Sequence, residues 1–538
     1  MNKDNKKTFN KRRLKYGAAA TAITIFVIVI IVFINLIADI LTERKGLKID
    51  LTSENLYEIS QDTLDYIKAI DSDVEIAVMM KKDQLENSTD GKMVVEILAN
   101  YERNSDHISV EYYDITENPD IVNKYAANYN GDIKNENIVI ACGDRIKVTS
   151  VLNLFNYDSY VYYQTGSLQS TGFKGEQQIT SAIMSVTDAN PIKIAVISMY
   201  NSQAIYSMEI DNAITSFVSL LNKNGYEYEP VDIFTDEISP DEYNMVILPA
   251  PASDLTDDCI KKLEDFLYNN GNLDKDMIYI ADVAQRKTPK IDEFLEVWGI
   301  EIGGNQVIES DNDKIQQINI SRSASRQAKA PVASIADESY SEELSNTKLP
   351  IVAPATRNIK LLFDANVDRT TKAILKTSET SVLHPLNITE QEDIAIDLSD
   401  SEGTEEEPTE EETESTTEFD IDNAEKSENV VMALVEKSNT DSNDVVHKNK
   451  LLVIGGASFT DPYITGVDTF NNAEFIVNTV NKISDKENGV FIAEKNFEST
   501  AITVTSSQLS TIKYFIVYTF PAIVIICGII VYLRRRNK

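Results

Sequence analysis

The chain carries few cysteines and histidines, which often act as nucleophiles or bind zinc, and they are scattered along it. Its three cysteines and three histidines are Cys142, Cys259, Cys527, His107, His384 and His447. No histidine stands near a cysteine or a second histidine at the spacing of a zinc site. The calcium-loop pattern D-x-[DN]-x-[DN]-G is also absent. We therefore predict no metal site and no cofactor.

A hydrolase or amidotransferase of the α/β class would place its nucleophile in a tight turn flanked by glycines, directly after a buried strand. Ser253 follows the apolar run 245–248, but its context PAPAS has no glycine. Ser458 in GGASFTD lacks the second glycine of such a turn, and Cys259 lies within the next expected helix. We predict no catalytic residue and no enzymatic activity. A cell-envelope enzyme with an unrecognised site is the alternative.

Nucleotide and redox motifs are missing as well. The phosphate-binding pattern G-x-x-x-x-G-K-[ST] does not occur, and Lys174 and Gly175 in GFKGEQQIT lack its spacing. Cys142 has no partner in a C-x-x-C motif. The chain is therefore not expected to hydrolyse ATP or to exchange disulfides.

Composition indicates a folded protein with an uneven charge distribution. The 538 residues suffice for two or three domains, and 42% hydrophobic with 25% charged residues is ordinary for globular protein. Both ends are basic, so residues 43–512 hold more negative charge than the −36 of the whole chain. Such a field repels phosphate backbones, which disfavours nucleic acid as a partner.

Two apolar segments predict membrane anchors. Residues 17–38 carry no charge and follow a basic tail, 1–16, and residues 514–533 are uncharged and precede the basic residues 534–538. About 20 apolar residues span the hydrocarbon layer, and basic flanks stay in the cytoplasm. We predict transmembrane helices at 17–41 and 514–533 in a bacterial cell membrane, with both termini cytoplasmic and residues 42–513 outside. The alternative, a cleaved signal peptide, is disfavoured because no small-residue cleavage pattern follows the first segment.

The region 42–165 shows the order β-α-β-α-β-β, which is that of a thioredoxin-like domain. Its strands are expected at 74–80, 108–113, 138–141 and 146–148, and its helices at 93–101 and 119–125. Ser60 is an N-cap candidate for a preceding helix. Gly143 and Asp144 suit a hairpin turn. Residues 166–190 are interpreted as a linker.

The regions 191–390 and 430–500 alternate apolar strands with amphipathic helices, which predicts a mainly parallel sheet with helices on both faces. Strands are expected at 192–197, 245–248, 277–281 and 451–454. Residues 391–429 interrupt this domain: from Glu392 to Asp422 there are 15 acidic residues and no Lys or Arg. We expect a disordered, solvated insertion. A cation-attracting or partner-binding segment is the alternative.

Several phrases together resemble the GldG-like family of auxiliary components of ABC-type transport systems. They are IDLTSENLYEISQDTLDYIKAID, ISVEYYDITENPDIVNKY, GEQQITSAIMSVTD, DEYNMVILPAPASDLTDDCIKKLEDFLYNNGN and LLVIGGASFTD. The resemblance implies a thioredoxin-like domain, then a glutamine-amidotransferase-like (flavodoxin-like) domain, with one membrane span at each end. The chain departs from the family's pattern at Ser198 to Asn201, where a Gly-His pair is usual, and at Asn270 before Gly271.

The resemblance also implies a function. Such a protein would be a non-catalytic accessory that stands outside the cytoplasm beside a separate ABC permease and a separate cytoplasmic ATPase, and works by contact with the permease. An envelope substrate, which the sequence does not identify, is a further candidate for contact. A cell-surface scaffold protein without a transporter is a further alternative.

Overall fold

The computed structural model describes residues 58–129, 131–198, 208–319, 327–386, 419–467, 469–486, 491–492, 495–497, 513–519 and 521. The chain divides into two compact units, Met1–Glu58 and Ile59–Lys538, and every described helix and strand belongs to the second. The expected span 17–41 lies outside the described residues, as does most of 514–533. Among the described residues, no helix is both long enough and apolar enough to cross a membrane.

The first sheet has four strands in the order β2-β1-β3-β4. β1 (Val74–Val78) and β2 (Ile108–Tyr112) run parallel, whereas β3 (Asn137–Cys142) is antiparallel to both β1 and β4 (Arg145–Ser150). A two-residue turn joins β3 to β4, and in it Gly143 has a φ of +58°. Glycine adopts this left-handed conformation without a steric penalty. The predicted hairpin is confirmed.

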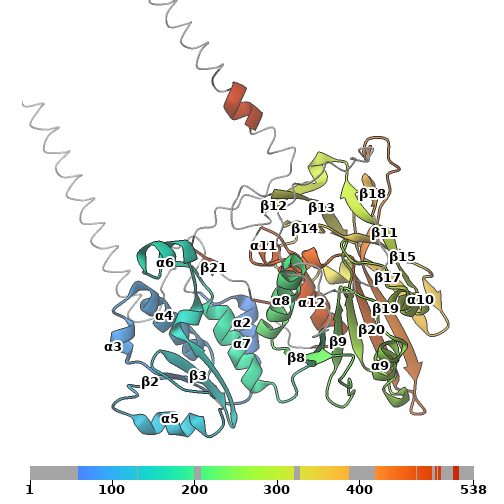
Figure 1. Ribbon diagram of the computed structural model, residues 1–538. Helices are drawn as coiled ribbons and strands as arrows, with labels where there is room; N and C mark the ends of the chain where they lie inside the picture. The colour runs from blue at the N-terminus through green and yellow to red at the C-terminus, as the bar shows by residue number, and fades with distance from the viewer. Residues whose placement is uncertain are drawn as a thin grey trace, which may run out of the picture. The chain divides into compact units, whose positions relative to one another are not determined.

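Helices cover both faces of the first sheet (Figure 1). On one face, Tyr125 of α5 (Pro119–Ala126) is buried against Met79 and Val139. Side chains alternate along a strand, so the buried Ile138 and Ile140 point to the other face. There α7 (Gly175–Thr187) contacts β3 and β4 and packs beside α4 (Thr89–Asn104).

The range 166–190, expected to be a linker, contains a strand and a core helix instead. β6 (Ser170–Phe173) is followed by α7, whose Ile179, Ile183 and Val186 recur at helical spacing and are buried. Arg145 of β4 donates hydrogen bonds to the carbonyl groups at the end of α7, from its Nε to Val186 at 2.5 Å and from a terminal nitrogen to Thr187 at 3.1 Å. Helix α7 therefore belongs to the first domain.

Smaller elements complete this domain. Ser60 accepts a hydrogen bond from the Thr63 amide and caps α2, which confirms the predicted N-cap. The remaining elements are α2 (Gln61–Ala69), α3 (Lys82–Leu85), η1 (Val151–Leu154), β5 (Phe155–Tyr157) and α6 (Ser159–Thr165). β5 and β6 form a three-stranded sheet with β21 (Lys495–Asn496), a strand from the far end of the chain.

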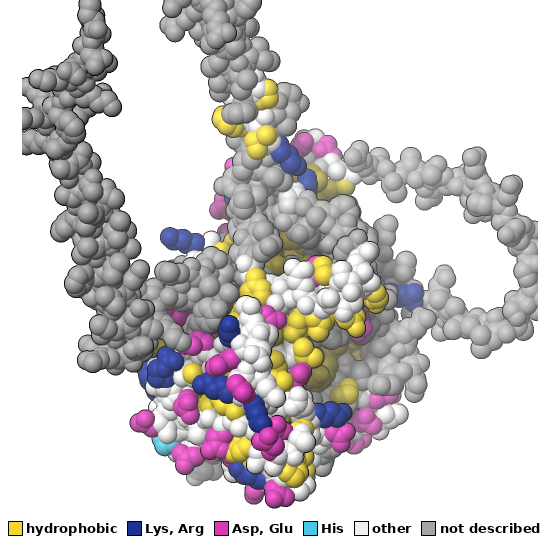
Figure 2. All heavy atoms as spheres, turned by 90° about the vertical axis from the view of Figure 1, so that its left-hand side faces the viewer, with side chains coloured by type: hydrophobic (Ala, Val, Ile, Leu, Met, Phe, Trp, Pro, Cys, Tyr) yellow, Lys and Arg dark blue, Asp and Glu magenta, His cyan; other side chains and the backbone are white. Residues whose placement is uncertain are grey.

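The surface seen in Figure 2 mixes acidic and basic side chains along its lower part, while hydrophobic side chains gather near its centre. Ion pairs of the first domain include Lys81 with Glu117 at 2.6 Å and Lys124 with Glu75 at 2.5 Å. Exposed pairs of this kind contribute little to stability. They do balance charge locally in a chain whose overall charge is strongly negative.

The second sheet begins with five parallel strands in the order β8-β7-β9-β10-β20. Their bounds are β7 (Lys193–Ser198), β8 (Glu227–Asp232), β9 (Met245–Pro249), β10 (Asp276–Ile280) and β20 (Val446–Ile454). Each of the four strands predicted in this region is present. Helix α8 (Met208–Lys223) ends just before Gly225, whose φ of +80° is typical of the residue that follows the end of a helix.

The sheet continues with antiparallel strands, so it is mixed and not mainly parallel as expected. Parallel strands are joined by a crossover that usually contains a helix, so strands and helices alternate in their sequence. Antiparallel strands need no such helix. Among the described residues between β11 and β19 there is no α-helix, and that signal is lost. These strands are β11 (Ile300–Glu309), β12 (Ile315–Asn319), β13 (Gln327–Ile335), β14 (Ile351–Val352), β15 (Arg357–Leu361), β16 (Ala365–Asn366), β17 (Arg369–Lys376), β18 (Ser381–Pro385) and β19 (Val430–Thr440). Of the acidic stretch 391–429, residues 391–418 lie outside the described residues.

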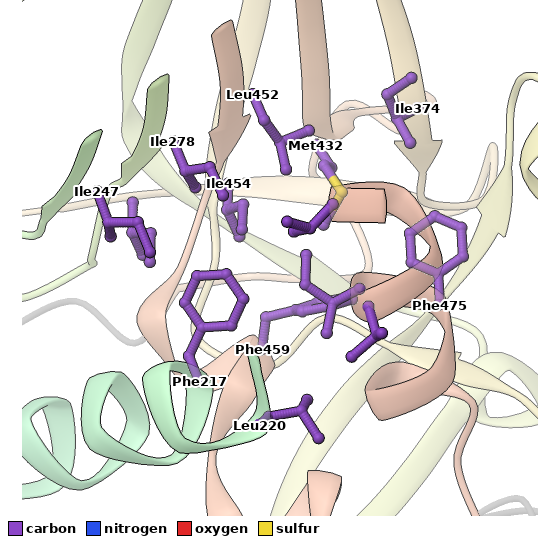
Figure 3. Packing of buried hydrophobic residues seen from close by; sticks show 14 of the residues in the cluster. Phe217, Leu220, Ile247, Ile278, Ile374, Met432, Leu452, Ile454, Phe459 and Phe475 are labelled. Atoms are coloured by element: carbon purple, nitrogen blue, oxygen red, sulfur yellow. The ribbon is translucent and has the colours of Figure 1, made fainter. Parts of the chain in front are cut away.

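Two buried clusters lie on opposite faces of the second sheet. One joins the strands to α8 and to α12 (Asn472–Ile483), with Phe217 and Phe475 at its centre (Figure 3). The other joins them to α9 (Asp257–Tyr268) and α10 (Pro289–Trp298). Helices thus cover both faces of the parallel half, as the sequence predicts.

Candidate functional site

The parallel strands of the second sheet end at one edge, which is where ligand sites form in α/β sheets. The strand order changes direction at β7, since β8 lies on one side of it and β9 on the other. The residues that follow β7, 199–207, are outside the described residues, and so is most of the predicted departure at Ser198 to Asn201. The described part of this edge consists of the turns after β8, β9, β10 and β20.

Asp282, directly after β10, is the central carboxylate of the edge. It is 3% exposed, and its carboxylate accepts hydrogen bonds from the backbone amides of Ala284, at 2.9 Å, and Ala457. Burial raises the pKa of this carboxyl, and the two amides and the Arg357 charge oppose that rise. Asp282 therefore connects the turn after β10 with the turn after β20.

Arg357, at the start of β15, supplies the opposite charge. Its side chain is buried, and its Nε donates a hydrogen bond to the Gly303 carbonyl at 2.9 Å. Its backbone amide donates to the Gly455 carbonyl at 2.8 Å. Burial lowers its pKa, and the nearby Asp292 and Asp282 counteract this effect. The edge thus holds one buried cation among carboxyl groups.

The side chains of Gln285, Tyr279 and Asp254, at the same edge, also form hydrogen bonds. Gln285 donates from Nε2 to the Tyr279 hydroxyl at 3.0 Å, and both side chains are buried. Burial raises the Tyr279 pKa, so the phenol stays protonated. Asp254 accepts from the backbone amides of Lys290 at 2.9 Å and Ile291 at 3.3 Å, which are first-turn donors of α10. This carboxylate therefore pairs with backbone amides at the start of α10, which have no partner within the helix.

The three candidate nucleophiles, Cys259, Ser458 and Ser253, are not brought together. Cys259 is 2% exposed, belongs to the cluster under α9, and directs its Sγ at the Ile233 carbonyl, 3.7 Å away. Ser458 lies in η5 (Ala457–Thr460), between two residues of the cluster on the opposite face. Ser253 is half-buried in the turn that leads to Asp254. Each of these residues occupies a separate position in the fold.

Residues 53–153 match a domain of unknown function, DUF7088. The match covers the four-stranded sheet of the first domain and ends before α7. No curated protein matches the chain at a significant level.

Three solved structures are similar to about half of the chain. The mmIFT52 N-terminal domain is 13% identical with a TM-score of 0.32, covering 55% of this chain and 97% of that one. A putative ThuA-like protein from Bacteroides uniformis ATCC 8492 is 13% identical with a TM-score of 0.30, covering 56% and 96%. The exo-β-1,4-mannosidase Op5Man5 from Opitutaceae bacterium strain TAV5 is 11% identical with a TM-score of 0.21, covering 55% and 42%. Similarities at this level carry no argument about function.

The remaining candidates also lie apart, four of them in or near the DUF7088 region. Cys142 ends β3, and the exposed His107 pairs through Nδ1 with Asp73 at 2.9 Å. Lys174 and Gly175 begin α7, where Gly175 is pressed against the Phe173 ring. Outside that region, the His384 ring lies 4.6 Å from that of Phe419, and Nδ1 of His447 lies 2.5 Å from Asp274. Among the described residues, no three metal-binding side chains gather at one place.

Sequence reasoning did not identify Asp282, Gln285 and Arg357 as partners. A signal was present in ADVAQ, where polar residues directly follow an apolar strand, but nothing in the sequence links it to Arg357, which comes 75 residues later in the chain. Only the pairing of β11 with β15, and of β10 with β20, brings these turns to one place.

Asp292 gives the edge a measurable pH dependence. Burial raises its pKa from 3.8 to about 6. Between these two values the folded protein binds more protons than the unfolded chain, so this group's contribution to stability falls as the pH rises from about 4 to above 6. Because the carboxyl is only partly buried, solvent screens some of this effect, and Asp292→Asn should remove a pH-dependent loss on the order of 1–2 kcal/mol.

Urea denaturation at pH 4.5 and pH 7.5 measures this pH dependence. Asp258→Asn, at an exposed position of α9, is the matched control and should leave the difference between the two pH values unchanged. Equal pH dependence in both variants would contradict the assignment.

Proposed function

We propose that the chain is a non-catalytic auxiliary subunit of an ABC-type transport system, similar to the GldG-like proteins. The observation that carries the proposal is that the charged side chains of the carboxyl edge, Asp282, Arg357 and Asp254, are engaged in hydrogen bonds with backbone groups. Cys259 and Ser458 lie in separate clusters. In the described part of the edge, the charged side chains therefore hold neighbouring turns together. This role suits a protein that works through contact with partners.

The finer fold assignment supports the same family. The order β2-β1-β3-β4, with a parallel first pair, a final hairpin, and helices on both faces, is compatible with the thioredoxin-like domain that we propose. The parallel strands β8-β7-β9-β10-β20 between two helix layers suit a glutamine-amidotransferase-like, flavodoxin-like domain. Two domains of these types in this order are what the GldG-like resemblance implies.

The proposed membrane arrangement comes from the sequence. The apolar segments 17–41 and 514–533, each with a basic flank, would anchor the chain twice, with both termini in the cytoplasm. Residues 42–513 would then face the outside, where they could contact a permease and an envelope substrate. In such a system, the separate cytoplasmic ATPase would supply the energy for transport.

Purification of the full chain from membranes in mild detergent tests this function. We expect an ABC permease and an ABC ATPase to be recovered with it, identified by mass spectrometry. An unrelated two-span protein of the same membrane is the control for non-specific recovery. Recovery of the chain without either ABC component would overturn the proposal and favour a scaffold protein.

Two substitutions separate the accessory role from the enzymatic alternative. Cys259→Ala and Ser458→Ala remove the nucleophiles that an amidotransferase-like or hydrolase-like enzyme would use. We expect both variants to recover the same ABC components and to restore transport in a deletion strain as the natural chain does. A loss of transport in either variant, with its thermal stability retained, would favour an enzyme.

A further inference from the structure

An uncharged and exposed segment of the first domain joins β5 to β6. Residues 159–173 contain no charged side chain, although 25% of the whole chain is charged. Residues 162–169, which are the end of α6 and the turn after it, are all exposed. Tyr162 is 50% exposed, Tyr163 89% and Leu168 52%. Large apolar side chains that are exposed together can mark a surface that contacts a partner or a membrane.

Part of the backbone of this α6 segment, residues 159–169, is hydrogen-bonded internally. The Gly166 amide donates to the Tyr162 carbonyl at 2.8 Å. Across the base of the segment, the Asp158 amide donates to the Gln169 carbonyl at 3.0 Å. Polar groups that already have a partner lose little when the surrounding water is removed. These backbone groups therefore do not oppose contact with an apolar medium.

The α6 segment lies where the chain leaves the first domain toward its second predicted anchor. β21 is antiparallel to β6, and the Phe497 amide, directly after β21, donates to the Thr171 carbonyl at 3.0 Å. Thr171 stands at the start of β6, so Phe497 and the α6 segment lie at the same end of this small sheet (Figure 1). Residues 498–512 connect Phe497 to the predicted anchor at 514–533, and a chain of that length spans at most about 55 Å.

The first predicted anchor is connected to the same part of the domain. Residues 42–57 follow that anchor and lead to Ser60. The Ser60 amide donates to Oε1 of Glu176 at 2.7 Å. Glu176 lies in the first turn of α7, which follows β6 directly. The chain thus enters and leaves the first domain close to β6, and two short connections would hold this part of the domain near the bilayer.

We propose that the α6 segment rests on the outer surface of the bilayer, with Tyr162, Tyr163 and Leu168 at the level of the lipid headgroups. Tyrosine is enriched at this level because its ring is apolar and its hydroxyl is polar. The net charge of −36 repels anionic lipids, and an uncharged segment can approach them without that cost. The inference rests on the two anchors of the proposed function, and not on the ABC partners.

Quenching by brominated lipid tests this contact. Full-length Tyr163→Trp is reconstituted in vesicles of phosphatidylcholine, with or without bromine on the acyl chains, and flotation verifies that the chain is bound. We expect bromine to lower the emission of the introduced tryptophan by about twofold or more, because tryptophan shares the interfacial position of tyrosine. Tyr268→Trp, at a 59% exposed position of α9, should show no such loss. The buried Trp298 contributes the same background to both variants.

A second substitution locates the contact. Added to Tyr163→Trp, Leu168→Asp places a charge in the α6 segment and should abolish most of the quenching, because a carboxylate is repelled from the apolar layer. Leu362→Asp, at a 47% exposed position of the second domain, is the matched control and should leave the quenching unchanged. Thermal unfolding verifies that each variant is folded.

The outcomes separate this inference from the proposed function. Flotation without quenching at position 163, or equal quenching at positions 163 and 268, would overturn the inference and leave the anchors intact. An unquenched emission that shifts to shorter wavelength as the protein concentration rises would overturn it in favour of contact with a second copy of the chain. Failure of the chain to float with the vesicles would overturn both the anchors and the inference.

Discussion

Replacing Arg357 by Met is expected to lower the free energy of unfolding by about 3–5 kcal/mol, because it leaves buried carboxyl groups without their counter-charge. Arg357 is 6% exposed, and its charge acts on Asp282 and Asp292. Methionine keeps most of the apolar volume, so the loss of charge dominates. Urea denaturation can be followed through the single tryptophan, Trp298, which is 5% exposed in α10.

The effect of Arg357→Met should also depend on pH. Without the guanidinium, the pKa of Asp282 and Asp292 rises further, and protonation relieves the uncompensated charge at low pH. The loss of stability should therefore be larger at pH 8 than at pH 5. Lys360→Met, at an exposed position of the same strand, is the matched control and should change stability by less than about 1 kcal/mol. A pH-independent loss at Arg357 would indicate a packing defect instead.

Replacing Phe217 by Ala is expected to cost a similar amount, about 3–5 kcal/mol, because it opens a cavity in a closely packed core. Phe217 is 0% exposed and lies between α8 and the parallel strands, beside Phe459 (Figure 3). The same urea titration measures the change. The denaturant dependence should stay the same, since the fold is retained.

Phe234→Ala provides the control for this substitution. Phe234 follows β8 and is 42% exposed, so its removal leaves no internal cavity. We expect a loss below about 1 kcal/mol. Similar losses at Phe217 and Phe234 would contradict the placement of the core between α8 and the sheet.

The parallel half of the second sheet was predictable because each step repeats a simple pattern. A short apolar strand such as β9 is followed by a helix such as α9, whose buried side chains recur every three or four residues. Local sequence therefore contains enough information to place both. The antiparallel half was not predictable, since β17 and β19 pair across a chain segment of more than 50 residues and need no helix between them.

The sequence of helix α7 contains a helical pattern of apolar residues, but it lies in the range 166–190, which was interpreted as a linker. Its apolar residues have helical spacing, yet buried polar side chains such as Glu176, Gln177 and Thr180 weaken the contrast between its faces. Those polar groups are satisfied by distant partners: Thr63 donates to the Glu176 carboxylate at 2.8 Å, and Tyr101 shares a hydrogen bond with Thr180 at 2.5 Å. Without these partners, the segment is indistinguishable from a polar linker.

By itself, the sequence determined the strands and helices of the parallel region, the hairpin at Gly143, the helix start at Ser60 and the scarcity of cysteine and histidine. These features depend on neighbours within a few residues. The tertiary structure decided which charges meet, because Asp282, Arg357 and Asp292 interact only after the strands have paired. It also decided where an acceptor such as Gln177 Oε1 is left without a donor among the described residues, because burial arises when distant segments pack together.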